Sequence, residues 1–182
     1  MTGKSSATLA NWMIKAGQLV QPLINLLRDQ LLAHDLIQMD ETTVQVLKEP
    51  GKTAQSKSYL WLQRGGPPDE PVILFDYDPT RCQAVPKALL EGFAGYLQAD
   101  GYSGYNGVVA EGGLVQVGCM AHARRKFSEA VKGQGKSPRQ GKAHQGLAWI
   151  QKLYRIEQQA RTQQLSAQAR QLHRQQHAAP VL

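Results

Sequence analysis

The 182-residue sequence contains little cysteine and no long apolar run. Cys82 and Cys119 are its two cysteines, too few for the disulfide framework of a small secreted protein. The chain has no apolar run of about 18 residues, and its first residues, MTGKSSATLANW, lack the continuous apolar segment of a signal peptide. We therefore expect a cytoplasmic protein without a membrane segment.

Motifs that mark several large enzyme classes are also missing. The sequence has no GxxxxGK[ST] loop, GxGxxG turn or GxSxG elbow. These motifs mark nucleoside-triphosphate hydrolases, dinucleotide-binding enzymes and serine hydrolases. Cys119 and His122 have a spacing that suits zinc, but two ligands are too few, and a buried thiol near a strand end is the alternative for Cys119.

Acidic residues are scarce in the last third of the chain. Residues 118–182 hold 12 Lys and Arg against 2 Asp and Glu (12 − 2 = +10), whereas residues 1–117 hold 9 against 12 (9 − 12 = −3). The basic third predicts a surface that binds phosphate groups. The alternative is a solvated helical face that is merely basic.

Helical and strand-like patterns alternate along the sequence. An apolar stripe from Leu9 to Leu31 predicts an amphipathic packing helix that Pro22 either kinks or splits. Strand patterns follow at 36–47, 57–64, 71–77, 95–99 and 114–119, and helices are expected at 86–93 and 120–132. The first three strands are expected to form an antiparallel meander. The order predicts an α/β protein with a mixed five-stranded sheet and flanking helices.

Two carboxylates, Asp40 and Asp100, lie 60 residues apart (100 − 40 = 60). Asp40 interrupts the first predicted strand, and Asp100 ends the fourth, where glycines stop the apolar run. If these two strands are neighbours, the carboxylates converge. Such a pair suits divalent cations that prefer oxygen ligands, and two ions about 3.5–4 Å apart promote phosphodiester cleavage. The alternative for an Asp inside a strand is an exposed edge position.

The helix expected at 120–132 combines an apolar stripe with a basic cluster. Its predicted buried face consists of Met120, Ala123, Phe127 and Val131. The candidate nucleic-acid-binding residues are His122, Arg124, Arg125 and Lys126. Arg125 is also one turn from Glu129, so an ordinary intrahelical ion pair is equally compatible with the sequence.

Three segments in order resemble the transposases of the insertion-sequence sixty-six family: QMDETTVQVL (38–47), LQADGYSGYN (97–106) and VGCMAHARRKF (117–127). The resemblance implies an RNase H-like catalytic core with a DDE active site that cuts and joins DNA using Mg²⁺, or Mn²⁺ in its place. Asp40 matches the first catalytic aspartate of the family and Asp100 the second, so both are expected to hold the metal ion. The implied partners are insertion-sequence ends and target DNA, with a homo-oligomer for the full-length form and a nucleoid-associated location in a bacterium.

The sequence departs from the family pattern at the third acid. That residue is a glutamate in a segment resembling Asn-Asn-x-x-Glu-Arg, and no such segment occurs before Leu182. Glu129 and Glu157 are poor substitutes, because each has an Arg four residues away. The family's N-terminal DNA-binding region is also missing, so we expect a truncated, internal piece of a transposase.

This interpretation divides the chain into four parts. They are a helical N-terminal segment (1–35), an incomplete RNase H-like core (36–132), a linker (133–143) and the start of a helical insertion (144–182). Whether the chain is an enzyme by itself stays open. The preferred hypothesis is a DDE transposase that is inactive in this form. The alternatives are a non-catalytic remnant that binds DNA and an RNase H-like nuclease. A sheet without its closing helix is expected to expose apolar surface.

Overall fold

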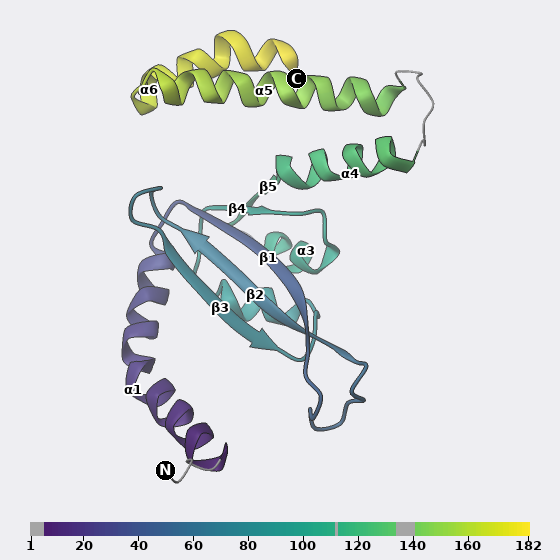
Figure 1. Cartoon of the computed structure of the whole chain (residues 1–182). Helices are drawn as coiled ribbons and strands as arrows, with labels where there is room; N and C mark the ends of the chain where they lie inside the picture. Colours follow the sequence, from purple (N-terminus) through teal and green to yellow (C-terminus); the bar gives the residue numbers. More distant parts are fainter. Residues whose placement is uncertain (1–5, 112, 134–140) are drawn as a thin grey trace, which may run out of the picture. The chain divides into compact units, whose positions relative to one another are not determined.

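The computed structural model describes residues 6–111, 113–133 and 141–182. The chain divides into two compact units, Met1–Gly118 and Cys119–Leu182. The first unit contains the sheet and the second consists of helices (Figure 1). Most of the predicted linker, residues 134–140, lies outside the described residues. Within the described ranges, no helix is both long and apolar enough to cross a membrane.

Five strands form the sheet: β1 Leu36–Gln45, β2 Lys57–Gly65, β3 Val72–Asp78, β4 Tyr96–Ala99 and β5 Val115–Gly118. Their order across the sheet is β3-β2-β1-β4-β5 (Figure 1). Strands β1, β2 and β3 are antiparallel, whereas β4 runs parallel to β1 and β5 runs parallel to β4. The structure confirms the expected mixed five-stranded sheet and its antiparallel meander.

Short helices fill the two connections that parallel strands require. The helix α2 (Ala84–Leu89) lies between β3 and β4, and the turn η1 (Ser103–Tyr105) with the helix α3 (Asn106–Ala110) lies between β4 and β5. Pro86 sits in the first turn of α2, where its missing N–H costs no hydrogen bond. The predicted helix at 86–93 therefore exists, although it begins two residues earlier and ends at Leu89.

The two faces of the sheet differ in burial because side chains alternate along each strand. One face carries buried residues such as Ile37, Trp61 and Leu97, which pack with residues from the connections, among them Leu90, Phe93, Tyr105 and Val108. The opposite face exposes a set of large apolar side chains: Leu36, Ile73, Phe75, Tyr77, Tyr96, Val115 and Val117. Phe75 is 62% exposed. The expected uncovered apolar surface on the sheet is thus confirmed.

The first helix, α1, is one element from Ser6 to Leu32 with Pro22 inside it. Its C-terminal part packs on the core through Leu31, with Ile24 and Leu27 beside it. Its N-terminal part runs away from the sheet (Figure 1), and Met13 is 74% exposed. The prediction of a packing helix along the whole stripe was wrong, because the sheet offers a surface only to the last turns.

The second unit is built from α4 (Met120–Gly133), α5 (Lys142–Thr162) and α6 (Ala167–His173), followed by the helical turns η2 (Arg174–Ala178) and η3 (Ala179–Val181). Ser166 caps α6 by accepting a hydrogen bond from the Ala169 N–H at 3.3 Å, as the sequence predicts. The chain then runs back along α5, where Arg174 binds Glu157.

The predicted buried face of α4 was wrong. No residue of α4 is buried, and Phe127 is 38% exposed. Its ring lies against Gly146 of α5, where an added Cβ would be only 2.6 Å from a ring carbon. Within its unit α4 packs against one helix, so half of its apolar stripe has no described neighbour there.

Candidate active site

The two carboxylates singled out in the sequence occupy the expected places in the sheet. Asp40 is in β1, and Asp100 directly follows Ala99, the last residue of β4. The strands are parallel neighbours that pair Leu36 with Tyr96 and Gln38 with Gln98, an offset of 60 residues. The same offset, continued two residues further, aligns Asp40 with Asp100.

Both carboxylates belong to the same face of the sheet. Side chains two residues apart on a strand share a face, so Asp40 lies on the side of Gln38, and Asp100 follows Gln98 in the same alternation. Gln38 Nε2 donates a hydrogen bond to Gln98 Oε1 at 2.5 Å, which shows that the two strands bring this face together one step before the carboxylates. Neighbouring strands are about 4.8 Å apart, a spacing that suits carboxylates sharing one ion.

Backbone N–H groups orient one oxygen of each carboxylate. The Glu41 N–H donates to Asp40 Oδ1 at 3.0 Å, and the Tyr102 N–H donates to Asp100 Oδ1 at 2.9 Å. The second contact is the side-chain turn typical of Asp where a strand ends. Both Asp residues are half-buried. The carboxylates therefore have defined orientations at the edge of a packed core.

Glu41, the neighbour of Asp40, faces the opposite side of the sheet. Its side chain is 2% exposed and forms an ion pair with Arg81, whose Nε lies 2.6 Å from Oε1. The buried Tyr105 hydroxyl donates to Glu41 Oε2 at 2.7 Å. With both oxygens bound on the core side, Glu41 is not placed to complete a metal site with Asp40.

Burial and charge act on the groups around Glu41. Burial raises the pKa of Tyr105, and the hydrogen bond to Glu41 raises it further, as do the negative charges of Asp100 and Asp40. Tyr105 is thus a permanent hydrogen-bond donor. Burial alone would lower the pKa of Arg81, but the bond and charge of Glu41 outweigh it and raise the pKa. Arg81 is therefore a permanent cation beside this carboxylate.

Metal ligands beyond the pair are not assembled. Among the residues that the structure describes, no group of three His, Cys, Asp or Glu side chains is placed to hold an ion. Cys119 is a half-buried free thiol at the start of the second unit. The available ligand set is therefore two aspartates, which suits Mg²⁺, an ion that proteins often bind through one or two carboxylates together with substrate phosphates.

The predicted basic cluster lies on α4, in the second unit. Arg124, Arg125 and Lys126 are exposed, and His122 is half-buried. A run of exposed cations on one helix can contact phosphate oxygens without reading bases. Carboxylates and basic cluster therefore belong to different units.

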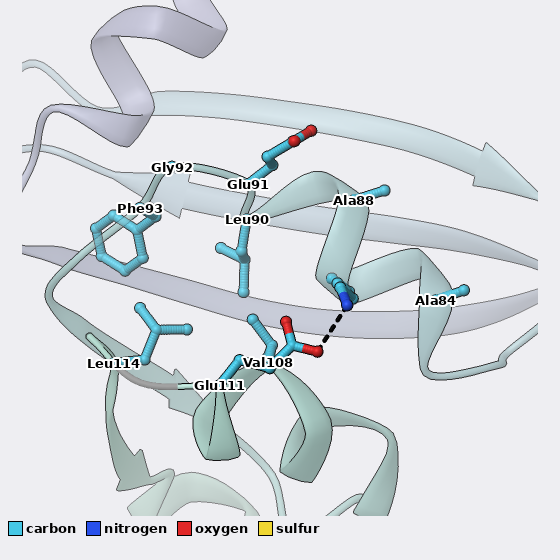
Figure 2. Close-up of a pocket in the computed structure, with 10 residues that line it drawn as sticks. Ala84, Ala88, Leu90, Glu91, Gly92, Phe93, Val108, Glu111 and Leu114 are labelled. Carbon is cyan, nitrogen blue, oxygen red and sulfur yellow. Dashed lines mark hydrogen bonds and ion pairs between the residues drawn. The ribbon is translucent and has the colours of Figure 1, made fainter.

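A pocket of about 520 Å³ opens between α2 and α3 (Figure 2). Leu90, Phe93, Val108 and Leu114 make its apolar lining, and Lys87 pairs with Glu111 at 2.6 Å beside them. Asp40 and Asp100 are not among its lining residues. Both charged side chains are more than half exposed, so no buried polar group converges on a ligand there. The pocket does not have the features of a catalytic site.

Arg81, Tyr102 and Tyr105 are the residues around the carboxylates that sequence reasoning missed. The Gly- and Tyr-rich segment after Asp100 is recognisable as a loop, but its composition does not tell which tyrosine is buried. Arg81 is a lone cation between Thr80 and Cys82, without a pattern that links it to β1. The signal available was the buried strand position of Glu41, which requires a partner.

Comparison with known proteins places the chain among transposases. Residues 4–182 match the family described as Transposase IS66 family. Three uncharacterized proteins of Sinorhizobium fredii (strain NBRC 101917 / NGR234) are similar. The protein y4jD is 31% identical over 96% of this chain and 35% of its own length. For y4qI the identity is 27% over 91% of this chain and 32% of its own length, and for y4hP it is 28% over 97% and 34%.

The chain spans about a third of the length of these relatives. No solved structure matches it significantly. The family match extends over both compact units, including the strand carrying Asp40, the loop at Asp100 and the basic helix α4. The chain therefore belongs to the IS66 family of transposases.

Proposed function

We propose that the first unit is the metal-binding part of a DDE-type transposase core with an RNase H-like sheet, and that Asp40 and Asp100 are its metal ligands. The observation that carries the proposal is the parallel pairing of β1 and β4 at an offset of 60 residues. The same number separates the two aspartates. Family membership alone would not predict that this register brings them to one level of the sheet.

The strand order supports the RNase H-like assignment. Three antiparallel strands come first, and two parallel strands then extend the sheet beside β1. This arrangement places β1 at the centre of the sheet, with a carboxylate on it and a second carboxylate at the end of the adjacent strand. Helices in the connections cover the other face, which leaves the carboxylate face open toward a substrate.

Asp40 and Asp100 would hold Mg²⁺, or Mn²⁺ in its place. When bound, the ion would lower the energy of charge on the attacking and leaving oxygens of a phosphodiester. The protein's own contribution is orientation: the Glu41 and Tyr102 N–H groups set the two carboxylates, and the hydrogen bond between Gln38 and Gln98 sets the strands. The proposed substrate is DNA, at insertion-sequence ends and at a target. A homo-oligomer of the whole protein stays a prediction.

A second candidate function is DNA binding without catalysis. It is favoured by the absence of a third carboxylate beside the pair within the described residues. The net charge of +10 on residues 118–182 (12 − 2) supports binding by itself. The two candidates differ in whether the aspartates bind a divalent ion.

Metal binding by the 182-residue chain tests the proposal directly. Mn²⁺ added to the protein is measured as free ion by electron paramagnetic resonance. We expect one saturable site that Asp40→Asn and Asp100→Asn each weaken by at least tenfold. Asp69→Asn, which removes an exposed carboxylate from a loop, is the matched control and is expected to leave the site unchanged.

Two results would contradict the proposal. One is Mn²⁺ binding that both aspartate variants retain in full. The other is a crystal structure in which the two carboxyl groups lie more than about 10 Å apart, because ion–oxygen bonds are only about 2.0–2.6 Å long.

A further inference from the structure

We propose that Arg81 and Tyr102 are positioning residues that hold the loop carrying Asp100 against β1, and so keep Asp100 beside Asp40. The inference rests on the proposed function in one respect, namely that the two aspartates bind a metal ion. The physical part, a loop held in place by side chains, stands on contacts in the first unit.

Backbone pairing does not reach the carboxylates by itself. The strand β4 has four residues, and its pairing with β1 runs from Tyr96 to Gln98 and stops there. Asp100 therefore follows the paired segment by two residues, in a loop with three glycines at 101, 104 and 107. Because glycine gives a loop many conformations, the position of Asp100 requires other contacts.

Arg81 provides the contact to β1. It lies in the connection between β3 and α2, and its guanidinium forms an ion pair with Glu41, the residue after Asp40. The Glu41 side chain is 2% exposed, so its position is fixed by the core. A planar guanidinium bound to a buried carboxylate has a defined orientation.

Tyr102 provides the contact to the loop. Its ring lies under the Arg81 guanidinium, with 3.7 Å between the guanidinium carbon and the ring centroid. Its hydroxyl donates to the Arg81 backbone carbonyl, and its N–H donates to Asp100 Oδ1 at 2.9 Å. A continuous set of contacts therefore runs from Glu41 through Arg81 and Tyr102 to Asp100.

Gly104 makes room for this arrangement. A Cβ at that position would lie 2.2 Å from Cε1 of Tyr102, so any larger residue would push the ring away. Tyr105 supports the ring from the core side, edge to face at 5.9 Å, while its hydroxyl binds Glu41. Both loop tyrosines thus connect to β1 through the same buried carboxylate.

Charge and positioning predict opposite effects for Arg81. Removing a cation near Asp100 would by electrostatics alone strengthen the binding of a divalent cation. If Arg81 positions the loop, its removal instead weakens binding, because the second carboxylate no longer stays beside the first. Removal of groups that orient metal ligands typically costs about 10- to 100-fold in affinity. The sign of the effect therefore separates the two roles.

The test uses the full 182-residue chain and two measurements. Hydrogen exchange of residues 100–105 without metal reports whether the loop is held, and Mn²⁺ affinity reports whether the ligands are. The variants are Tyr102→Phe, which keeps the ring and the net charge, Arg81→Met, and Gly104→Ala. Lys87→Met is the matched control, because it removes a cation from an exposed ion pair on α2.

We expect faster exchange of residues 100–105 in all three variants, with exchange in β2 and β3 unchanged, and at least tenfold weaker Mn²⁺ binding in Arg81→Met. Lys87→Met should change neither measurement. Unchanged exchange of the loop in both Tyr102→Phe and Arg81→Met would overturn the inference, as would tighter Mn²⁺ binding in Arg81→Met. If the unaltered chain binds no Mn²⁺ but the loop exchange rises as expected, the positioning of Asp100 is supported and the proposed metal site fails.

Discussion

Gln38 and Gln98 face each other across β1 and β4, with Nε2 of Gln38 donating to Oε1 of Gln98 at 2.5 Å. The pair lies one step along each strand before Asp40 and Asp100. Arg64 of β2 adds a hydrogen bond from Nη1 to Gln38 Oε1 at 3.0 Å. Three neighbouring strands are thus joined on the face that carries the carboxylates, and a charge placed at this level should be felt by an ion between them.

Gln98→Glu should therefore strengthen Mn²⁺ binding. Two residues along a strand span about 7 Å, and a unit negative charge at that distance from a divalent ion contributes about 1 kcal/mol in water. We expect a dissociation constant about threefold to tenfold lower at low ionic strength. Gln116→Glu adds the same charge to β5 on the alternate face and should have a smaller effect. Equal effects of the two variants would mean that the ion is not on the Gln98 face.

Asp76→Ala should destabilise the first unit. Asp76 accepts two hydrogen bonds of 2.8 Å from Arg28 of α1 and one of 2.5 Å from the fully buried Gln63. Its loss leaves a buried amide without an acceptor, which costs about 1–3 kcal/mol. Urea unfolding of the chain should show this decrease. The exposed Asp69→Ala is the control, and an equal decrease there would remove the assigned role.

The positions of the two aspartates could be predicted from sequence because strand patterns have clear ends. The apolar run before Asp100 stops at glycines, and the β-branched run around Asp40 continues on both sides. A period of two assigns each side chain to a face once the register is known. What joined them was the parallel pairing of β1 and β4, which the sequence indicated only through the connection at α2.

Other features could not be predicted, because they depend on what lies opposite. The stripe of α1 has the period of a packing helix along its whole length, but only its end meets the sheet. The same holds for Phe127 in α4, whose one described neighbour helix within its unit is α5. Arg81 became identifiable only when folding placed it beside Glu41. Periodicity reports which face is apolar and not whether a partner is present.

The pair of Glu157 and Arg174 should make the second unit less stable in acid. The hydrogen bond from Arg174 lowers the pKa of Glu157 below its ordinary value. A lowered folded-state pKa means that the contribution is present above the unfolded pKa and is lost as pH falls through the folded one, hence below about pH 4.5. Surface pairs of this kind contribute about 0.2–1 kcal/mol.

Thermal unfolding followed by circular dichroism should therefore show Glu157→Gln less stable than the unaltered chain at pH 7 and equally stable near pH 3. Glu129→Gln is the control, because Glu129 and Glu157 are the two acidic side chains of residues 119–182. A difference between Glu157→Gln and the unaltered chain that persists at pH 3 would place the effect elsewhere than in this ion pair.

DNA binding by the chain should depend on phosphate contacts of α4. Each phosphate neutralised contributes about 0.9 to the slope of log affinity against log salt. Changing Arg124, Arg125 and Lys126 together to Ala should flatten that slope by up to about 2.7. Binding of a scrambled duplex should be as strong, because these contacts carry no base readout. Lys152, Arg155 and Arg161 changed to Ala on α5 are the matched set, and an equal flattening would spread the contacts over the whole unit.

The 182-residue chain alone should not cleave or join DNA at a useful rate. Two aspartates can hold one divalent ion, but no third acid lies beside them among the described residues, and Glu41 is bound on the opposite face by Arg81 and Tyr105. A second ion without its ligand set would be weakly held, so charge on one of the two reacting oxygens would lack stabilisation. Each 1.36 kcal/mol lost from the transition state slows the reaction tenfold. A plasmid-nicking assay with Mg²⁺ or Mn²⁺ should show no more product than the Asp100→Asn control. Metal-dependent nicking that disappears in Asp100→Asn would overturn this expectation, and it would require a further ligand, with Glu129 and Glu157 as the candidates in the second unit.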